Sequence, residues 1–311
     1  MIGIVGRKQY RNTGVETFQK QVIPKLSQHE DFEKIDYRFS TKYPFSITVS
    51  RLRFGRRLSD LGDDYSKIFI PSQDLVSCDP EKVDAEIIPY VHDILPVTTN
   101  FSGWVATPLA KHYTQNLEKL DQVICASKHT ARELRHRTRF TGKTQVIYQG
   151  IEPVETDNVE RDIDLLYVGS LIPRKNPDLV RESIRLAEKQ GYNCAAVNFE
   201  PLDLPCQTYT NVTDKELFQL YRRSRYYIHS SKAEGFGRTP VEAQSQGCVP
   251  LALPLPINKE VLGDGFLEVE SKNDVVQQLS RKTDLRENAR SNAERFDWSE
   301  TRQQLYEVLT R

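Results

Sequence analysis

Residues 234–242 read Glu-Gly-Phe-Gly-Arg-Thr-Pro-Val-Glu, which sets two carboxylates eight positions apart around a glycine-rich turn. Pro240 suits the first position of a helix, because its φ angle is fixed near the helical value and its missing N–H is not needed there. We therefore expect Glu234 in a loop and Glu242 about one turn into the following helix. Glycines permit close approach of the backbone, and N–H groups at a helix start bind anions. The stretch predicts a site for a ligand that carries both phosphates and hydroxyls.

On either side of this stretch, short apolar runs alternate with longer amphipathic segments. Apolar residues at helical spacing predict helices such as Val15–Leu26, Pro177–Ala187 and Asp214–Tyr221. The short apolar runs predict β-strands, which we place at Ile2–Val5, Lys67–Ile70, Glu86–Val91, Gln122–Ala126, Gln145–Tyr148, Asp164–Val168, Cys194–Asn198, Tyr226–Ser230 and Val249–Leu253. This alternation is typical of parallel sheets with helices on both faces, so the fold class is α/β and doubly wound.

The domain organisation follows from an acidic segment without periodicity, residues 152–162. We interpret it as a linker, because a fresh strand begins directly after it. It separates an N-terminal Rossmann-like domain, residues 1–151, from a C-terminal Rossmann-like domain, residues 163–295. Residues 296–311 predict a final helix, which we expect to return to the N-terminal domain.

Composition limits the class of protein. The chain has 311 residues, 38% hydrophobic and 28% charged, which is typical of a soluble globular protein of two domains. No apolar run approaches the ~20 residues that span a bilayer, and the first strand begins without a signal-peptide pattern, so we expect a cytoplasmic protein. The five cysteines are widely spaced, which argues against a disulfide framework or a zinc site.

The formal net charge of zero hides an uneven distribution. Residues 1–150 contain 22 Lys and Arg against 17 Asp and Glu, a surplus of five positive charges. This surplus favours an anionic partner but is too weak to indicate nucleic acid. Four arginines, Arg51, Arg53, Arg56 and Arg57, are interleaved with Leu and Phe, which is typical of an ordinary solvated helix face; contact with anionic lipid at the inner membrane face is the alternative.

Four features occur in order along the chain. Gly14 follows the first strand, His92 ends the strand at residues 86–91, residues 168–177 read Val-Gly-Ser-Leu-Ile-Pro-Arg-Lys-Asn-Pro, and the stretch 234–242 follows. Together they resemble the retaining glycosyltransferases of family four. That family has the GT-B fold, in which two Rossmann-like domains face each other across a cleft.

The resemblance implies roles for residues of the glycine-rich stretch. Glu242 would bind the ribose hydroxyls of a nucleotide, since a carboxylate accepts two hydrogen bonds from a vicinal diol. Glu234 would face the donor sugar. The backbone N–H groups of Gly235, Phe236 and Gly237 would hold sugar hydroxyls or a phosphate.

A second set of implied roles concerns the donor diphosphate. Lys175 and Arg174 would neutralise it, Arg as a fork and Lys as a point charge. Gly169 and Ser170 would line the same donor site. Many relatives carry an arginine where Ser170 stands, so Arg174 would supply that charge here.

Two implied roles fall in the N-terminal domain: Gly14 would let the first loop approach the diphosphate, and His92 would lie near the reacting centre. The implied chemistry is sugar transfer with retention, in which the leaving phosphate accepts the acceptor's proton. Such chemistry needs preorganised charge and no catalytic metal. Asp162-Ile163-Asp164 imitates a metal-binding Asp-x-Asp, but its place at the end of the linker favours a structural role.

The donor and acceptor are less specific predictions. The His-Asp and Pro-Arg-Lys-Asn combination resembles the mannosyltransferase branch, so GDP-mannose is the first expected donor and a UDP-sugar the second. The acceptor would be a glycan or a lipid-linked sugar. Two alternatives stay open, namely a non-catalytic subunit that binds sugar nucleotide and a sugar-nucleotide epimerase on the same fold.

Overall fold

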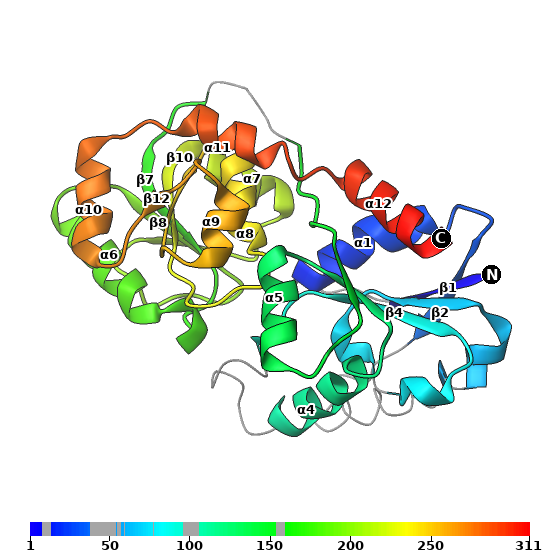
Figure 1. The fold of residues 1–311 in the computed structure, drawn as a ribbon. Coiled ribbons are helices and arrows are strands. Elements are labelled where there is room, and N and C mark those ends of the chain that lie inside the picture. Colours follow the sequence, from blue (N-terminus) through cyan, green and yellow to red (C-terminus); the bar gives the residue numbers. More distant parts are fainter. Residues whose placement is uncertain are drawn as a thin grey trace. The chain divides into compact units, whose positions relative to one another are not determined.

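The structure is a computed structural model that describes residues 1–7, 14–37, 54, 57, 58, 60–76, 78–95, 106–153 and 159–311. Its contacts divide the chain into two compact units, which Figure 1 draws in sequence colours. The first unit comprises Met1–Gly150 together with Trp298–Arg311, and the second comprises Ile151–Asp297. The last helix, α12 (Trp298–Thr310), therefore belongs to the first unit although it ends the chain.

The first unit is built on a parallel sheet with the strand order β2-β1-β3-β4-β5-β6. Its strands are β1 (Ile2–Arg7), β2 (Phe32–Tyr37), β3 (Lys67–Ile70), β4 (Glu86–Val91), β5 (Gln122–Cys125) and β6 (Lys143–Val146). The inner strands β3 and β4 are almost wholly buried. Burial on both faces explains why these strands are nearly continuous apolar runs in the sequence.

Helices flank the sheet of the first unit on both faces. Side chains of α4 (Ala106–Leu117) and α5 (Lys128–Arg137) join one apolar cluster with residues of the central strands. Aromatic contacts mark the other face, where the ring of Phe18 on α1 (Gly14–Leu26) contacts Tyr90 and the first residue of α12, Trp298. The hydroxyl of Thr301 on α12 also donates to the carbonyl oxygen of Tyr148 at 2.9 Å.

The second unit has a parallel sheet with the strand order β12-β11-β10-β7-β8-β9. Its strands are β7 (Ile163–Val168), β8 (Cys194–Asn198), β9 (Gln207–Thr210), β10 (Ser224–His229), β11 (Val249–Ala252) and β12 (Leu267–Glu268). In order of sequence within the unit this is the 3-2-1-4-5-6 arrangement of dinucleotide-binding folds.

Side chains of successive residues on β7 enter two separate apolar clusters. Leu165 and Tyr167 face α6 (Pro177–Lys189) and α10 (Lys272–Arg281), whereas Leu166 faces the other cluster. That second cluster includes residues of α7 (Asp214–Arg223) and α8 (Arg238–Ser245); α9 (Pro256–Leu262) and α11 (Arg286–Ala293) contact α8. Figure 1 shows α6 and α10 on one side of this sheet and α7 and α8 on the other.

Candidate functional site

The second unit brings together two loops that lie far apart in the sequence. β7 and β10 are neighbouring central strands, and the loops at their carboxyl ends contain residues 169–176 and 230–237. The strand order reverses between them, since β8 and β9 lie beyond β7 and β11 and β12 lie beyond β10. In open α/β sheets, ligands bind outside the carboxyl ends of the strands at such a switch point. The topology therefore favours these two loops as a binding site.

Hydrogen bonds to backbone carbonyls join the two loops directly. The N–H of Lys232 donates to the carbonyl oxygen of Arg174 at 2.9 Å, and the hydroxyl of Ser230 donates to the carbonyl oxygen of Lys175. The guanidinium of Arg174 donates to the carbonyl oxygen of Ala233 at 3.0 Å. These bonds fix the backbone that carries two cationic side chains at the end of β7.

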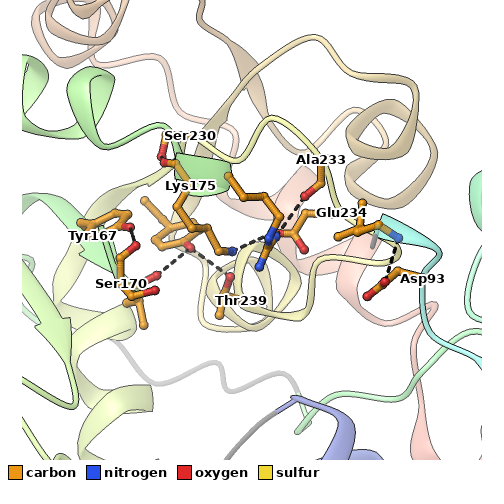
Figure 2. Close-up of polar contacts among 12 residues, drawn as sticks. Asp93, Tyr167, Ser170, Lys175, Ser230, Ala233, Glu234 and Thr239 are labelled. Atoms are coloured by element: carbon orange, nitrogen blue, oxygen red, sulfur yellow. Dashed lines mark hydrogen bonds and ion pairs between the residues drawn. The ribbon is translucent and has the colours of Figure 1, made fainter. Parts of the chain in front are cut away.

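Glu234 forms ion pairs with both of these cations. Its Oε1 atom lies 2.6 Å from Nζ of Lys175 and 2.8 Å from Nη1 of Arg174. Figure 2 shows the Lys175 side chain extended toward the Glu234 carboxylate. The Glu234 side chain is only 13% exposed, so the cluster is largely shielded from water. The sequence predicted a common site for these three residues, and the structure brings them into direct contact.

Electrostatics keeps the Glu234 carboxylate ionised. Burial by itself raises the pKa of Glu234, but the charges of Lys175 and Arg174 outweigh burial and lower this pKa to about 2. The cluster is therefore a preformed charged site, with two cations around one carboxylate.

Glu234→Gln is expected to make the free energy of unfolding less sensitive to acid than it is in wild type. The pKa of Glu234 falls from 4.5 to about 2 on folding, so its ion pairs contribute stability well above pH 4.5 that is lost as the pH falls toward 2. Between pH 5 and pH 3 the loss is about 2 kcal/mol of unfolding free energy. Urea unfolding of wild type and variant at both pH values measures the difference. Equal losses in the two proteins would contradict this account.

The second carboxylate, Glu242, lies inside helix α8 and has a different partner. Its Oε1 atom accepts from Nη2 of Arg238 at 2.8 Å, one helical turn earlier. The prediction that Pro240 opens this helix was wrong by two residues, because α8 begins at Arg238. Gly237 precedes it with a φ of 83°, a left-handed conformation that favours glycine and lets the chain turn sharply into the helix.

Tyr227 lies within electrostatic reach of both carboxylates. Burial raises the pKa of Tyr227 well above 10, and the charges of Glu234 and Glu242 raise it further. Its hydroxyl donates to Oγ1 of Thr239 at 3.0 Å, next to the start of α8. The phenol therefore stays protonated and connects the end of the β-sheet to this helix.

The remaining predicted residues of the second unit shape the backbone of the two loops. Gly169 has a φ of 141°, and the hydroxyl of Tyr167 donates to the carbonyl oxygen of Ser170 at 2.8 Å (Figure 2). The Phe236 side chain is buried and makes an edge-to-face contact with Phe296 at 5.3 Å between ring centroids. Phe236 therefore anchors the glycine-rich turn, so only its backbone is suited to a ligand.

His229 is a buried residue of this region that the sequence did not assign to the site. Its ring stacks on Tyr227 at 6.1 Å, and its Nε2 atom has no hydrogen-bond partner within the described part of the chain. Burial lowers the pKa of His229 to about 3, and the nearby Lys175 charge acts in the same direction. The imidazole is therefore neutral at physiological pH. No sequence signal marks it, because it ends a strand as an ordinary buried residue would.

His92 lies in the first unit, directly after β4, and both of its ring nitrogens are hydrogen-bonded. Nε2 donates to the carbonyl oxygen of Pro71 at 2.9 Å, and Nδ1 accepts from Nε2 of Gln149 at 3.1 Å. The backbone N–H of His92 donates to Oε1 of Gln73 at 3.0 Å. These contacts select the Nε2–H tautomer and fix the ring.

Other predictions in the first unit fall partly outside the described residues. Gly14 begins α1, and the loop before it, residues 8–13, is not described. Of the four arginines proposed for membrane contact, Arg51, Arg53 and Arg56 lie outside the described residues. Arg57 is exposed and donates to the carbonyl oxygen of Asp36 at 3.1 Å.

Among the described residues, no group of three or more His, Cys, Asp or Glu side chains is arranged to hold a metal ion. The Asp-x-Asp sequence has structural partners, since Asp162 pairs with Arg223 and Asp164 accepts from the N–H of Asn193. In the part of the chain that the structure covers, no helix is long and apolar enough to span a membrane.

Comparisons with known proteins show what the chain is similar to. The family model "Glycosyl transferases group 1" matches residues 205–297. The serotype-specific mannosyltransferase WbdA of Escherichia coli is 24% identical over 262 residues, covering 67% of this chain and 31% of that protein. The chain thus spans about a third of the length of this curated relative.

Solved structures agree along almost the whole chain. Sucrose-phosphate synthase from Thermosynechococcus elongatus has a TM-score of 0.75 at 13% identity, with 99% of this chain and 97% of that chain covered. Anabaena HepE, solved in complex with UDP and glucose, has a TM-score of 0.71 at 16% identity, with 99% of each chain covered. Two units with six-stranded parallel sheets, matched in this way, define a GT-B fold. The chain is thus similar to the group 1 glycosyltransferases over residues 205–297, and its two units have the GT-B fold.

Proposed function

We propose that the protein transfers a hexose from a nucleoside-diphosphate sugar to a glycan or lipid-linked acceptor, with retention at the anomeric carbon. The observation that carries this proposal is the ion-paired cluster of Lys175, Arg174 and Glu234 at the switch point of the second unit. Two fixed cations beside the turn into α8 suit a diphosphate.

The proposed roles in the second unit follow the chemistry of each group. Lys175 and Arg174 hold the diphosphate, and Glu242, oriented by Arg238, binds the ribose hydroxyls. Glu234 contacts the sugar, and the backbone of residues 235–237 donates N–H groups to sugar or phosphate. Gly169 and Ser170 line the donor site.

Gly14 and His92 are the proposed contributions of the first unit. Gly14 opens α1 and gives the first loop close access to the diphosphate. His92 presents a ring held in one tautomer by Pro71 and Gln149, which suits a group that positions the donor sugar. Arg51, Arg53, Arg56 and Arg57 remain the proposed contact with anionic lipid.

In the proposed reaction, the bond between the anomeric carbon and the phosphate oxygen breaks and a bond to the acceptor oxygen forms on the same face. The acceptor's proton passes to the departing phosphate. The two cations stabilise the negative charge that grows on the diphosphate as the bond breaks. Because the phosphate serves as the base, a buried carboxylate with a low pKa is compatible with this chemistry.

The first expected donor is GDP-mannose, which the similarity to a mannosyltransferase supports. The second is a UDP-sugar, which the similarity to HepE, solved with UDP and glucose, supports.

Incubation of the protein with GDP-mannose, UDP-glucose and UDP-N-acetylglucosamine, with and without candidate acceptors, tests the proposal. We expect one donor to be consumed, slowly by hydrolysis and faster with an acceptor, and NMR of the product to show a retained anomeric configuration. Binding of a donor without any turnover would indicate a non-catalytic subunit. Release of nucleotide with an epimerised sugar would indicate an epimerase.

A further inference from the structure

The two cations at the end of β7 are already paired with an anion of the protein itself. A single oxygen, Oε1 of Glu234, accepts from both Lys175 and Arg174 at 2.6 and 2.8 Å. These distances are those of charge-assisted hydrogen bonds to a carboxylate or phosphate oxygen. The carboxylate thus uses the same two cations that the proposed function assigns to the diphosphate.

A diphosphate and the Glu234 carboxylate therefore compete for the same donors. Lys175 carries a single positive charge, and Arg174 already uses its Nη1 atom for both Glu234 and the carbonyl oxygen of Ala233. Two anions so close together repel each other, and the low exposure of the cluster weakens screening by water. A bound diphosphate must displace the carboxylate or share the cations with it.

We propose that Glu234 acts as an internal substitute for the diphosphate, pairing with Lys175 and Arg174 and competing with the nucleoside diphosphate for them. This inference rests on the proposed function and adds to it a role in product release. After transfer, the carboxylate returns to the two cations as the diphosphate departs. The intact donor compensates for this competition through contacts with its sugar, which the product lacks.

The backbone of the cluster does not depend on Glu234. The N–H of Lys232 on the carbonyl oxygen of Arg174 and the hydroxyl of Ser230 on the carbonyl oxygen of Lys175 hold the loops together without the carboxylate. A Glu234→Gln variant therefore keeps the backbone that carries both cations in place and removes one negative charge. The change in anion affinity in this variant therefore measures the competition between the Glu234 carboxylate and the diphosphate.

Isothermal titration of wild type and Glu234→Gln with inorganic pyrophosphate, GDP, UDP and the two nucleosides tests the inference. We expect the variant to bind pyrophosphate and the matching diphosphate about tenfold more tightly, while binding of the nucleoside stays unchanged. Glu268→Gln is the matched control, because Glu268 pairs with Lys259 at 3.0 Å on the exposed surface of the same unit. This control is expected to bind every ligand as wild type does.

Unchanged or weaker binding of pyrophosphate and diphosphate to Glu234→Gln would overturn the inference. Glu234→Asp is a second test. It keeps the negative charge on a side chain that is one methylene shorter, so it should tighten binding of pyrophosphate and diphosphate by a smaller factor than Glu234→Gln does. Tighter pyrophosphate binding in a protein that transfers no sugar would leave the inference standing and refute the proposed function. Measured sugar transfer without tighter binding would support the proposed function and refute the inference.

Discussion

Lys175→Met is expected to lower the rate of sugar transfer at saturating donor by about a hundredfold to a thousandfold, the loss typical of one preorganised group that stabilises developing charge. The ammonium group lies 2.6 Å from Oε1 of Glu234, and in the proposed reaction it stabilises the departing diphosphate. Because that charge is largest as the bond breaks, kcat should fall more than KM rises. Steady-state kinetics with the identified donor measures both.

Lys259→Met is the matched control for this prediction. Lys259 also pairs with a glutamate, Glu268, at 3.0 Å, but the two side chains are 57% and 52% exposed. An exposed pair contributes little, so the control should stay within about twofold of wild type. Lys175→Arg, which keeps the positive charge, should recover part of the lost rate. Equal rates for Lys175→Met and Lys259→Met would refute the role given to Lys175.

The central strands were predictable because parallel strands buried on both faces are continuous apolar runs. Three predicted strands, Lys67–Ile70, Glu86–Val91 and Cys194–Asn198, agree with the structure in both bounds. The strands that the sequence did not reveal, β2, β9 and β12, all lie at the edges of their sheets. Edge strands are less buried and are short or rich in polar residues, so their apolar signal is weak.

The residues of the site were predictable from the sequence, but the ion pairs between them were not. The stretch 234–242 and the Arg174-Lys175 pair are local motifs, whereas their ion pairs join positions 59 and 60 residues apart and depend on β7 and β10 being neighbours. The buried side chain of Phe236 and the helix start at Arg238 depend on tertiary contacts and turn geometry. Local sequence patterns therefore do not predict the burial of Phe236 or the first residue of α8.

Gly150→Ala is expected to destabilise the first unit by about 3 kcal/mol, the upper range for overpacking a rigid interior. Gly150 ends the first segment of that unit, beside the start of α12. A Cβ atom added there would lie 2.6 Å from both the N and the Cα atoms of Trp298. These are backbone atoms of a helix that is fixed by a hydrogen bond from Thr301 to Tyr148, so the clash has no cheap relief. Urea unfolding measures the change.

Gly191→Ala separates this steric effect from the conformational freedom of glycine. Gly191 has a φ of 83°, and an added Cβ atom would meet nothing within 4 Å, so its substitution should cost only about 1 kcal/mol. Gly150 also follows Gln149, the partner of His92, so a displaced Trp298 should disturb that ring and reduce transfer as well. Equal destabilisation by the two substitutions would mean that α12 yields to the new methyl group. In that case the close approach of Trp298 would not be what makes a side chain costly at position 150.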